Sequence, residues 1–129
     1  MKRSLKLNPN NKPAAAAQIK AWRDKHEASP VATTLGSFDC DILSEKRMQD
    51  AVDEFHNLTT RNSDGTLNWV RGDNSVVALT QPELQSIITE VVKKRAVRSA
   101  SLHVKAFMFK AQEVKPTPTQ LADIDFWLN

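Results

Sequence analysis

One group of carboxylates in this 129-residue sequence is dense enough to suggest metal chemistry. It consists of Asp39, Asp41, Asp50 and Asp53. A calcium site needs about six to eight oxygen ligands, which proteins often supply from a loop that contains a glycine for the turn. No such loop spacing occurs here, so we expect these side chains to be solvated carboxylates at a strand end and on a helix surface.

The three histidines and the single cysteine do not indicate a reactive site either. His26, His56 and His103 lie in separate segments and lack the HExxH spacing of a zinc site. Cys40 has no basic neighbour that would favour the thiolate, and a single cysteine cannot form an internal disulfide, which is typical of folding in the cytosol. The sequence contains no GxSxG, P-loop or GxGxxG pattern. We therefore expect a protein that is not an enzyme and binds no metal or cofactor.

The tripeptide Arg71-Gly72-Asp73 matches the sequence that integrins read, yet its surroundings favour a structural explanation. It lies in "NWVRGDNSVVAL", where aromatic and β-branched residues on both sides favour strands. Gly, Asp and Asn tolerate the backbone angles of a tight turn, so we predict a β-hairpin with the tripeptide at its tip. Thr80 and Glu83 have the spacing of a capping box, which predicts a helix directly after the hairpin.

Other segments complete the predicted secondary structure. Residues 13–29 favour a helix that stops before Pro30. The stretch "VATTLGSFDCDI" predicts a short strand or small hairpin, and Ser44 is the candidate N-cap of the next helix. Beyond Pro82 there is no glycine or proline before Pro116, which predicts a last helix of about 30 residues and about 45 Å. We expect such a helix to outrun a small domain, so that its outer half contacts something else.

These elements predict one small α+β domain, residues 13–112, with the element order α-β-α-β-β-α and a long C-terminal helix. The length fits one domain, and a hydrophobic content of 40% is ordinary for a globular protein. Two extended arms are expected: a basic N-terminal arm, residues 1–12, and a proline-containing linker with an apolar C-terminal tail, residues 113–129. Trp22 and Trp69 are expected to lie in the core.

Charge is distributed unevenly along the chain, whose formal net charge is +3. Residues 42–90 carry eight acids and four bases, whereas residues 91–129 carry seven bases and three acids. The basic last helix makes nucleic acid a conceivable partner, but its bases are not interleaved with aromatic residues before Phe107. A solvated face, or docking on an acidic neighbour such as the 42–90 region of another copy, is favoured. No apolar run reaches the roughly 18 residues of a membrane span, so no membrane insertion is expected.

Two groups of residues are predicted to bind partner proteins. The first is the apolar tail, where a terminal aromatic side chain could anchor in a groove of the partner, because such anchors dominate interface energies. Folding of the tail onto its own domain is the alternative. The second is the basic part of the last helix. The predicted contact residues are Leu121, Ile124, Phe126, Trp127 and Leu128 in the tail, and Lys93, Lys94, Arg95 and Arg98 in the helix.

Three blocks of the sequence resemble a small domain of unknown function that is common in bacteriophage tail and tail-fibre proteins. The blocks are "IKAWRDKHEASPV", "FDCDILSEKRMQDAV" and "LNWVRGDNSVVALTQPELQSII", in that order, and the resemblance covers roughly residues 14–110. The residues that carry it are Trp22, Arg23, Asp24, Phe38, Asp41, Arg47, Trp69, Asp73, Asn74, Leu79, Thr80 and Leu84. The basic N-terminal arm and the basic last helix depart from the pattern.

The resemblance implies a component of a virion tail that is made in the cytoplasm of a bacterial host, and it implies no catalytic residues. We expect a non-enzymatic structural or accessory protein of the tail tip, baseplate or fibre attachment. It would act by contacts with other phage tail proteins, in an oligomer or multi-subunit assembly. Two alternatives stay open: a small basic phage or regulatory protein that binds nucleic acid, and a tail-fibre assembly chaperone.

Overall fold

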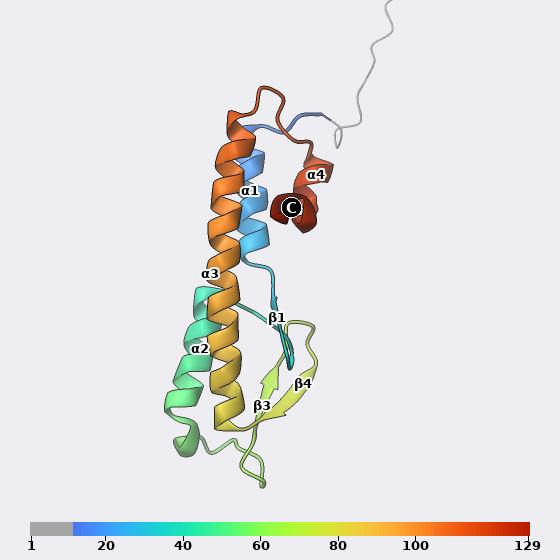
Figure 1. Ribbon diagram of the computed structural model, residues 1–129. Coiled ribbons are helices and arrows are strands. Elements are labelled where there is room, and N and C mark those ends of the chain that lie inside the picture. The colour runs from blue at the N-terminus through green and yellow to red at the C-terminus, as the bar shows by residue number, and fades with distance from the viewer. Residues whose placement is uncertain (1–11) are drawn as a thin grey trace, which may run out of the picture. The chain divides into compact units, whose positions relative to one another are not determined.

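The computed structural model describes residues 12–129, and its fold class is α+β, as predicted (Figure 1). The predicted N-terminal arm, residues 1–12, lies outside the described residues except for Lys12. The chain divides into two compact units. We call Ala28–Val97 the central unit, and Met1–Glu27 together with Arg98–Asn129 the terminal unit. The long helix α3 (Gln81–Ala111) contributes residues to both.

Two small antiparallel hairpins and two helices build the central unit. Strands β1 (Val31–Thr33) and β2 (Gly36–Phe38) form the first hairpin. Helix α2 (Ile42–Asp53) follows, and a short 3-10 helix, η2 (Phe55–Asn57), continues from its end. Strands β3 (Leu67–Val70) and β4 (Val76–Leu79) form the second hairpin, in which Leu67 pairs with Leu79 and Val70 with Val76.

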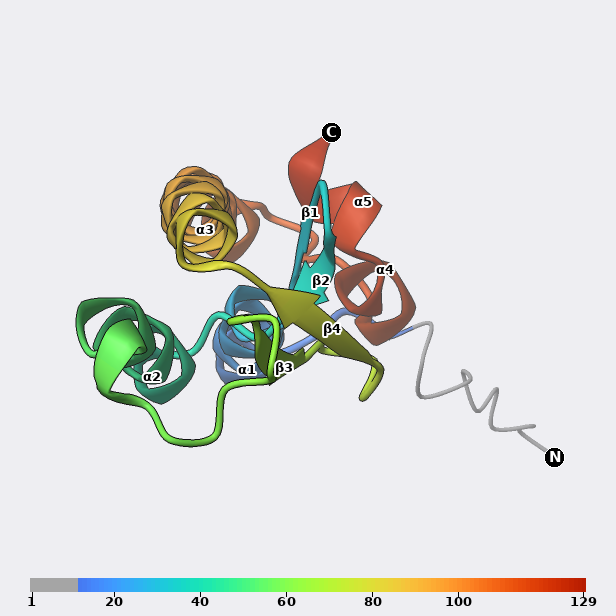
Figure 2. The ribbon, with the colours of Figure 1, turned by 90° about the horizontal axis from the view of Figure 1, so that it is seen from below.

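The core of the central unit lies between helix α2, the first half of α3 and the hairpins (Figure 2). Each helix turns one apolar stripe inward, with the spacing of three and four residues that a helical period requires. The buried residues are Val31, Phe38, Cys40, Met48, Ala51, Val52, Phe55, Leu67, Leu79, Leu84, Ile87, Ile88 and Val91. Trp69, expected in the core, is half-buried and packs against its edge.

The start of α3 confirms the predicted capping box. The backbone N–H of Thr80 donates to the Glu83 carboxylate (2.9 Å), and the N–H of Glu83 donates to the Thr80 hydroxyl (3.3 Å). These bonds satisfy two of the N–H groups that a helix start leaves without intrahelical partners. The hydrogen bond from the Thr80 backbone also lowers the pKa of Glu83.

The start of α2 differs from the prediction. Asp41, not Ser44, is the N-cap, and its carboxylate accepts the backbone N–H of Ser44 (3.3 Å). The Ser44 hydroxyl donates to the same carboxylate, and this bond is the main cause of the lowered pKa of Asp41. Asp and Ser are comparably good caps, so with both within three positions the sequence alone did not distinguish them.

The Arg71-Gly72-Asp73 tripeptide lies at the tip of the β3–β4 hairpin, as predicted. The Arg71 guanidinium donates to the carbonyl of Leu35 (2.8 Å), which ties this tip to the β1–β2 turn. The Asp73 carboxylate accepts the N–H (2.9 Å) and the hydroxyl of Ser75 inside the turn. Asn74 adopts a positive φ of 70°, which Asn tolerates better than most residues. Arg71 and Asp73 therefore stabilise the local fold.

Gly72 is needed because another part of the chain passes close by. Its N–H donates to the carbonyl of Ser37 (2.8 Å), and a Cβ at this position would lie 2.9 Å from Cβ of Pro30. We predict that Gly72→Ala lowers the free energy of unfolding by about 1–3 kcal/mol, because the rigid proline ring must shift. Thermal unfolding checks this. In a Pro30→Gly background the same change should cost clearly less, and an equal cost would contradict the clash.

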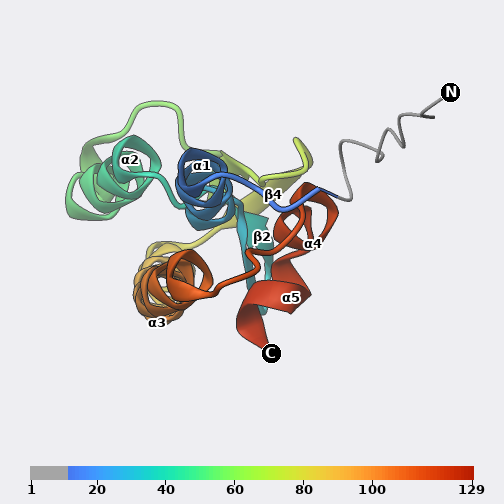
Figure 3. The same cartoon turned by 90° about the horizontal axis from the view of Figure 1, so that it is seen from above.

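The terminal unit contains helix α1 (Ala16–Glu27), the second half of α3, and two short helices, α4 (Pro118–Ala122) and α5 (Ile124–Leu128) (Figure 3). Its buried residues form a second core, with Trp22, Ile124 and Phe126 packed around it. The buried set is Ala14, Ile19, Leu102, Ala106, Phe109, Leu121 and Trp127.

This second core corrects two predictions. Residues 113–129 are not an extended arm, because Thr117 caps α4 with a full capping box and Trp127 is buried. The indole N–H of Trp127 donates to the carbonyl of Leu121 (2.8 Å). The outer half of α3 also packs within the chain on one side, since Leu102, Ala106 and Phe109 lie in this core. Four of the five apolar side chains assigned to a partner, all except Leu128, instead complete a core within the chain.

Candidate functional site

Four of the five predicted contact residues in the tail are buried or half-buried. Leu121 and Trp127 are fully buried, whereas Ile124 and Phe126 are half-buried. The ring of Phe126 stacks on Phe109, with a centroid distance of 5.1 Å. Leu128 is 46% exposed. The tail therefore offers a partner little apolar surface, and the prediction of a terminal aromatic anchor does not hold for Trp127.

Three of the four predicted basic contact residues bind groups of their own unit. Lys94 donates to the carbonyl of Ala32 (2.8 Å) and pairs with Glu90 (3.1 Å). Arg95 forms a partly buried ion pair with Glu45. Arg98 donates to the carbonyl of Glu27 (3.0 Å), and Lys93 is exposed. These bases are used largely in holding the fold together.

Three of the five exposed large apolar side chains among the described residues of the terminal unit lie on α3 itself. We define the outer face of α3 as Ala100, Val104, Phe107, Met108 and Ala111. Val104 is 56% exposed, Phe107 72% and Met108 48%. With about 3.6 residues per turn, these positions lie opposite Leu102, Ala106 and Phe109, which fill the core. Helix α3 is therefore apolar on two opposite faces, one of which faces solvent.

The sequence analysis assigned the outer half of this helix to a partner through its bases and did not single out these apolar residues. The stretch "ASLHVKAFMF" alternates between the two faces, so neither face stands out. A helix that is apolar all round is normally buried on all sides. That rule could have pointed to a surface in need of a partner.

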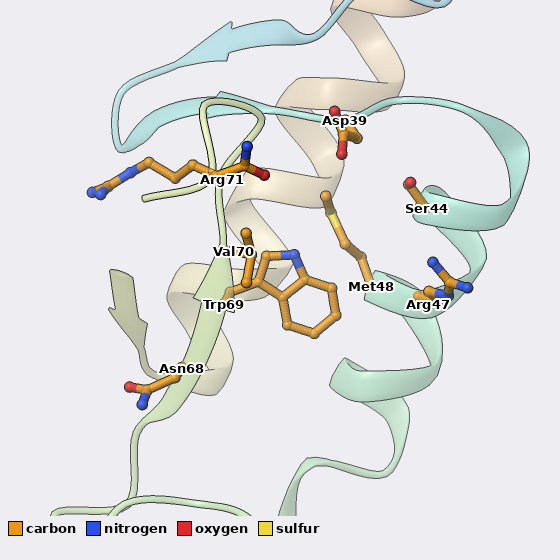
Figure 4. A pocket seen from close by; sticks show the side chains of 9 residues that line it. Asp39, Ser44, Arg47, Met48, Asn68, Trp69, Val70 and Arg71 are labelled. Atoms are coloured by element: carbon orange, nitrogen blue, oxygen red, sulfur yellow. The ribbon is translucent and has the colours of Figure 1, made fainter. Parts of the chain in front are cut away.

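A shallow groove in the central unit is the second candidate site (Figure 4). It lies between α2 and β3, and we call it the α2–β3 groove. Its first part has a volume of about 310 Å³, with the indole of Trp69 and the buried Met48 between the strand and the helix. The residues around this part are Asp39, Ser44, Arg47, Met48, Asn68, Trp69, Val70, Arg71 and Asn74.

The groove continues along α2 and β3. This second part, of about 550 Å³, shares Arg47, Asn68 and Trp69 with the first. It is mainly apolar through Ala51, Leu58 and Leu67, and it carries the carboxylates of Asp50 and Glu54. Together the two parts follow the whole length of β3 and most of α2.

Three polar groups in the first part of the groove are open to a ligand. Within residues 12–129, neither the Asp39 carboxylate nor the Arg47 guanidinium forms a hydrogen bond or ion pair, and the indole N–H of Trp69 has no acceptor. The hydrogen bond from the Ser44 hydroxyl is the main cause of the lowered pKa of Asp41, and the charge of nearby Arg47 is the smallest of its causes. Figure 4 shows Arg71 pointing away from Trp69. Free polar groups beside an apolar floor are typical of a binding site.

The described part of the chain offers little for other kinds of site. Across residues 12–129, no group of three or more His, Cys, Asp or Glu side chains is arranged to hold a metal ion. Within the same residues, no helix combines the length and apolar character needed to cross a bilayer. His26, the one histidine buried in a core, lies within hydrogen-bond distance of the carbonyl of Leu121 (2.6 Å) and contacts the ring of Trp127.

Comparison with known proteins identifies a family but no characterised relative. No curated protein and no solved structure matches the chain. One family model does match, and its match covers residues 10–126, which is most of the sequence. The chain therefore belongs to the family described as a domain of unknown function, DUF4376.

Proposed function

We propose that this protein is a non-enzymatic structural or accessory component of a bacteriophage tail that acts through protein–protein contacts. The observation that carries the proposal is the outer face of α3. The bacteriophage setting is supported by the resemblance of the three sequence blocks to a domain of tail and tail-fibre proteins. The geometry supports contact rather than catalysis, because the exposed features are an apolar helix face and a shallow groove.

The outer face of α3 has the properties of a protein contact surface. Contiguous exposed apolar side chains are costly in water, and on a folded protein they mark interaction sites. Phe107 and Met108 are of the kinds enriched in interface cores. His103 and Lys110 are exposed beside the face, and no acid occurs between Val91 and Gln112. An apolar surface with an acidic rim on another tail protein is the complementary partner.

Incorporation into particles tests the proposal directly. Mass spectrometry of purified particles from the virus that encodes this chain should detect the native protein. The double variant Val104→Asp, Phe107→Asp should fold but be lost from particles, because two charges in an apolar interface core cost several kcal/mol. Val76→Asp, a change at an exposed strand residue of the central unit, serves as the control and should be incorporated normally.

Each result of this experiment has a defined meaning. If the native protein were absent from mature particles but present in assembly intermediates, it would be an assembly chaperone rather than a tail component. Absence from both would contradict the tail assignment. Normal incorporation of the double variant would show that the outer face is not the contact.

Nucleic-acid binding is the alternative function from a different class. We predict that the protein does not bind nucleic acid. Of the four predicted bases, Lys94, Arg95 and Arg98 hold groups within the fold. Of this set, that leaves only Lys93 to release counterions from a phosphate backbone without loss of such a bond. Electrophoretic mobility shifts at two salt concentrations should show no retardation of DNA or RNA. Retardation at low salt that weakens steeply with added salt would instead establish nucleic-acid binding.

A further inference from the structure

We infer that the α2–β3 groove binds an extended peptide segment of another protein, which adds to the free edge of β3 as a further strand. The segment is basic and places an apolar side chain beside Trp69. This inference rests on the central unit alone. It does not depend on the proposed function, which rests on the terminal unit.

The first support is an unpaired strand edge. Among the described residues β3 pairs only with β4. The N–H of Arg71 donates to the carbonyl of Ser75 (2.7 Å), which fixes the alternation of the antiparallel ladder. By that alternation Leu67 and Trp69 bond to β4, whereas the backbone groups of Asn68 and Val70 point away from it. Both of these residues line the groove.

The second support is the match between the groove and an extended chain. A strand of four residues spans about 13 Å, and both parts of the groove follow β3 along α2. Successive side chains of an added strand point to opposite faces, so every second one enters the groove. The half-buried ring of Trp69 offers an apolar contact for such a side chain. Main-chain bonds then give affinity and the pocket gives specificity, as in known strand addition.

The third support is the set of free polar groups. The indole N–H of Trp69 and the guanidinium of Arg47 are donors without acceptors of their own in residues 12–129, and peptide carbonyls are suitable acceptors. The residues that line the groove include three carboxylates, those of Asp39, Asp50 and Glu54. The free positive charge among these lining residues is that of Arg47. Asp50 also pairs with Lys46 (2.9 Å), at the surface. The excess of carboxylates favours a segment with Lys or Arg beside its apolar residue.

Fluorescence anisotropy with labelled peptides tests the inference on the full chain. The probe is a heptapeptide of alternating lysine and leucine. The same peptide with glutamate in place of lysine tests the charge preference. Two N-methylated forms test strand addition, one methylated on the amides of the odd residues and one on those of the even residues. Only one of these two sets faces β3, so we expect one methylated form to bind and the other to lose about tenfold or more in affinity.

Two proline variants test which edge is used. Val70→Pro removes an N–H from the free edge of β3, and Ala78→Pro removes the corresponding N–H from the outer edge of β4, since Asn68 and Ala78 are directly opposed. Proline is tolerated at such outward positions. We expect Val70→Pro to weaken binding of the lysine–leucine peptide about tenfold or more and Ala78→Pro to leave it unchanged.

Several results would overturn the inference. Equal binding of both N-methylated forms, or equal binding by the two proline variants, would exclude strand addition at β3. Preference for the glutamate peptide, or no binding of any peptide at millimolar concentration, would exclude a basic peptide as the partner. If a proline variant fails to fold, the methylated peptides with the native chain still decide the question.

Discussion

Replacing Trp127 by alanine should lower the free energy of unfolding by about 3–5 kcal/mol. The ring is fully buried and lies edge-on to Phe109, with a centroid distance of 4.9 Å. It also contacts the ring of His26, and its N–H bonds to the carbonyl of Leu121. Truncation would remove these contacts and leave a cavity at the centre of the terminal unit. Denaturant unfolding followed by circular dichroism measures the loss.

Leu128→Ala is the matched control for this prediction. Leu128 belongs to the same helix but is 46% exposed, so its truncation should change the free energy of unfolding by less than about 1 kcal/mol. If both variants were as stable as the native chain, the C-terminal helices would not be packed on the terminal unit. The original prediction of a free tail would then be restored.

The second large effect is expected when a buried phenylalanine is replaced by alanine. The same replacement at an exposed phenylalanine should have little effect. Phe38 is fully buried in the core of the central unit, whereas Phe107 is 72% exposed on the outer face of α3. Phe38→Ala should cost about 3–5 kcal/mol. Phe107→Ala should change stability by less than about 0.5 kcal/mol, because it removes few contacts and alanine favours the helix. Chemical denaturation of both variants gives the two values.

The same pair separates folding from function. If the outer face contacts a tail partner, Phe107→Ala should reduce incorporation into particles although the protein remains as stable as the native chain. Phe38→Ala should reduce incorporation only as far as it reduces the amount of folded protein. A marked loss of stability in Phe107→Ala would show that this side chain is packed rather than presented to solvent.

Local features of the fold were predictable from the sequence. The capping box of Thr80 and Glu83, the hairpin around Gly72 and the length of α3 depend on residues within a few positions of one another. Their physical causes are turn geometry, capping and helix propensity, which short stretches of sequence carry. The choice of Asp41 over Ser44 as the N-cap shows the limit of this information, because two good caps were available.

Features that depend on distant residues were not predictable. The burial of Trp127 requires Ile19 and Phe109, from helices far apart in sequence, to enclose one volume. The α2–β3 groove similarly joins Asp39, Arg47 and Trp69 from separate elements, with no motif that connects them. The same apolar residues in the tail fitted either a partner or an internal core. Only the packing of the terminal unit distinguishes these outcomes.

The burial of Cys40 provides a built-in reporter. Its thiol is 1% exposed in the central unit and donates to the carbonyl of Ser29, so a thiol-reactive dye can modify it only when that unit opens. In a Trp69→Phe background, the remaining tryptophans, Trp22 and Trp127, both belong to the terminal unit. The rate of dye modification would then report the opening of the central unit, and the rate of change of indole fluorescence would report that of the terminal unit. Equal rates would show that the two units unfold together as one cooperative unit.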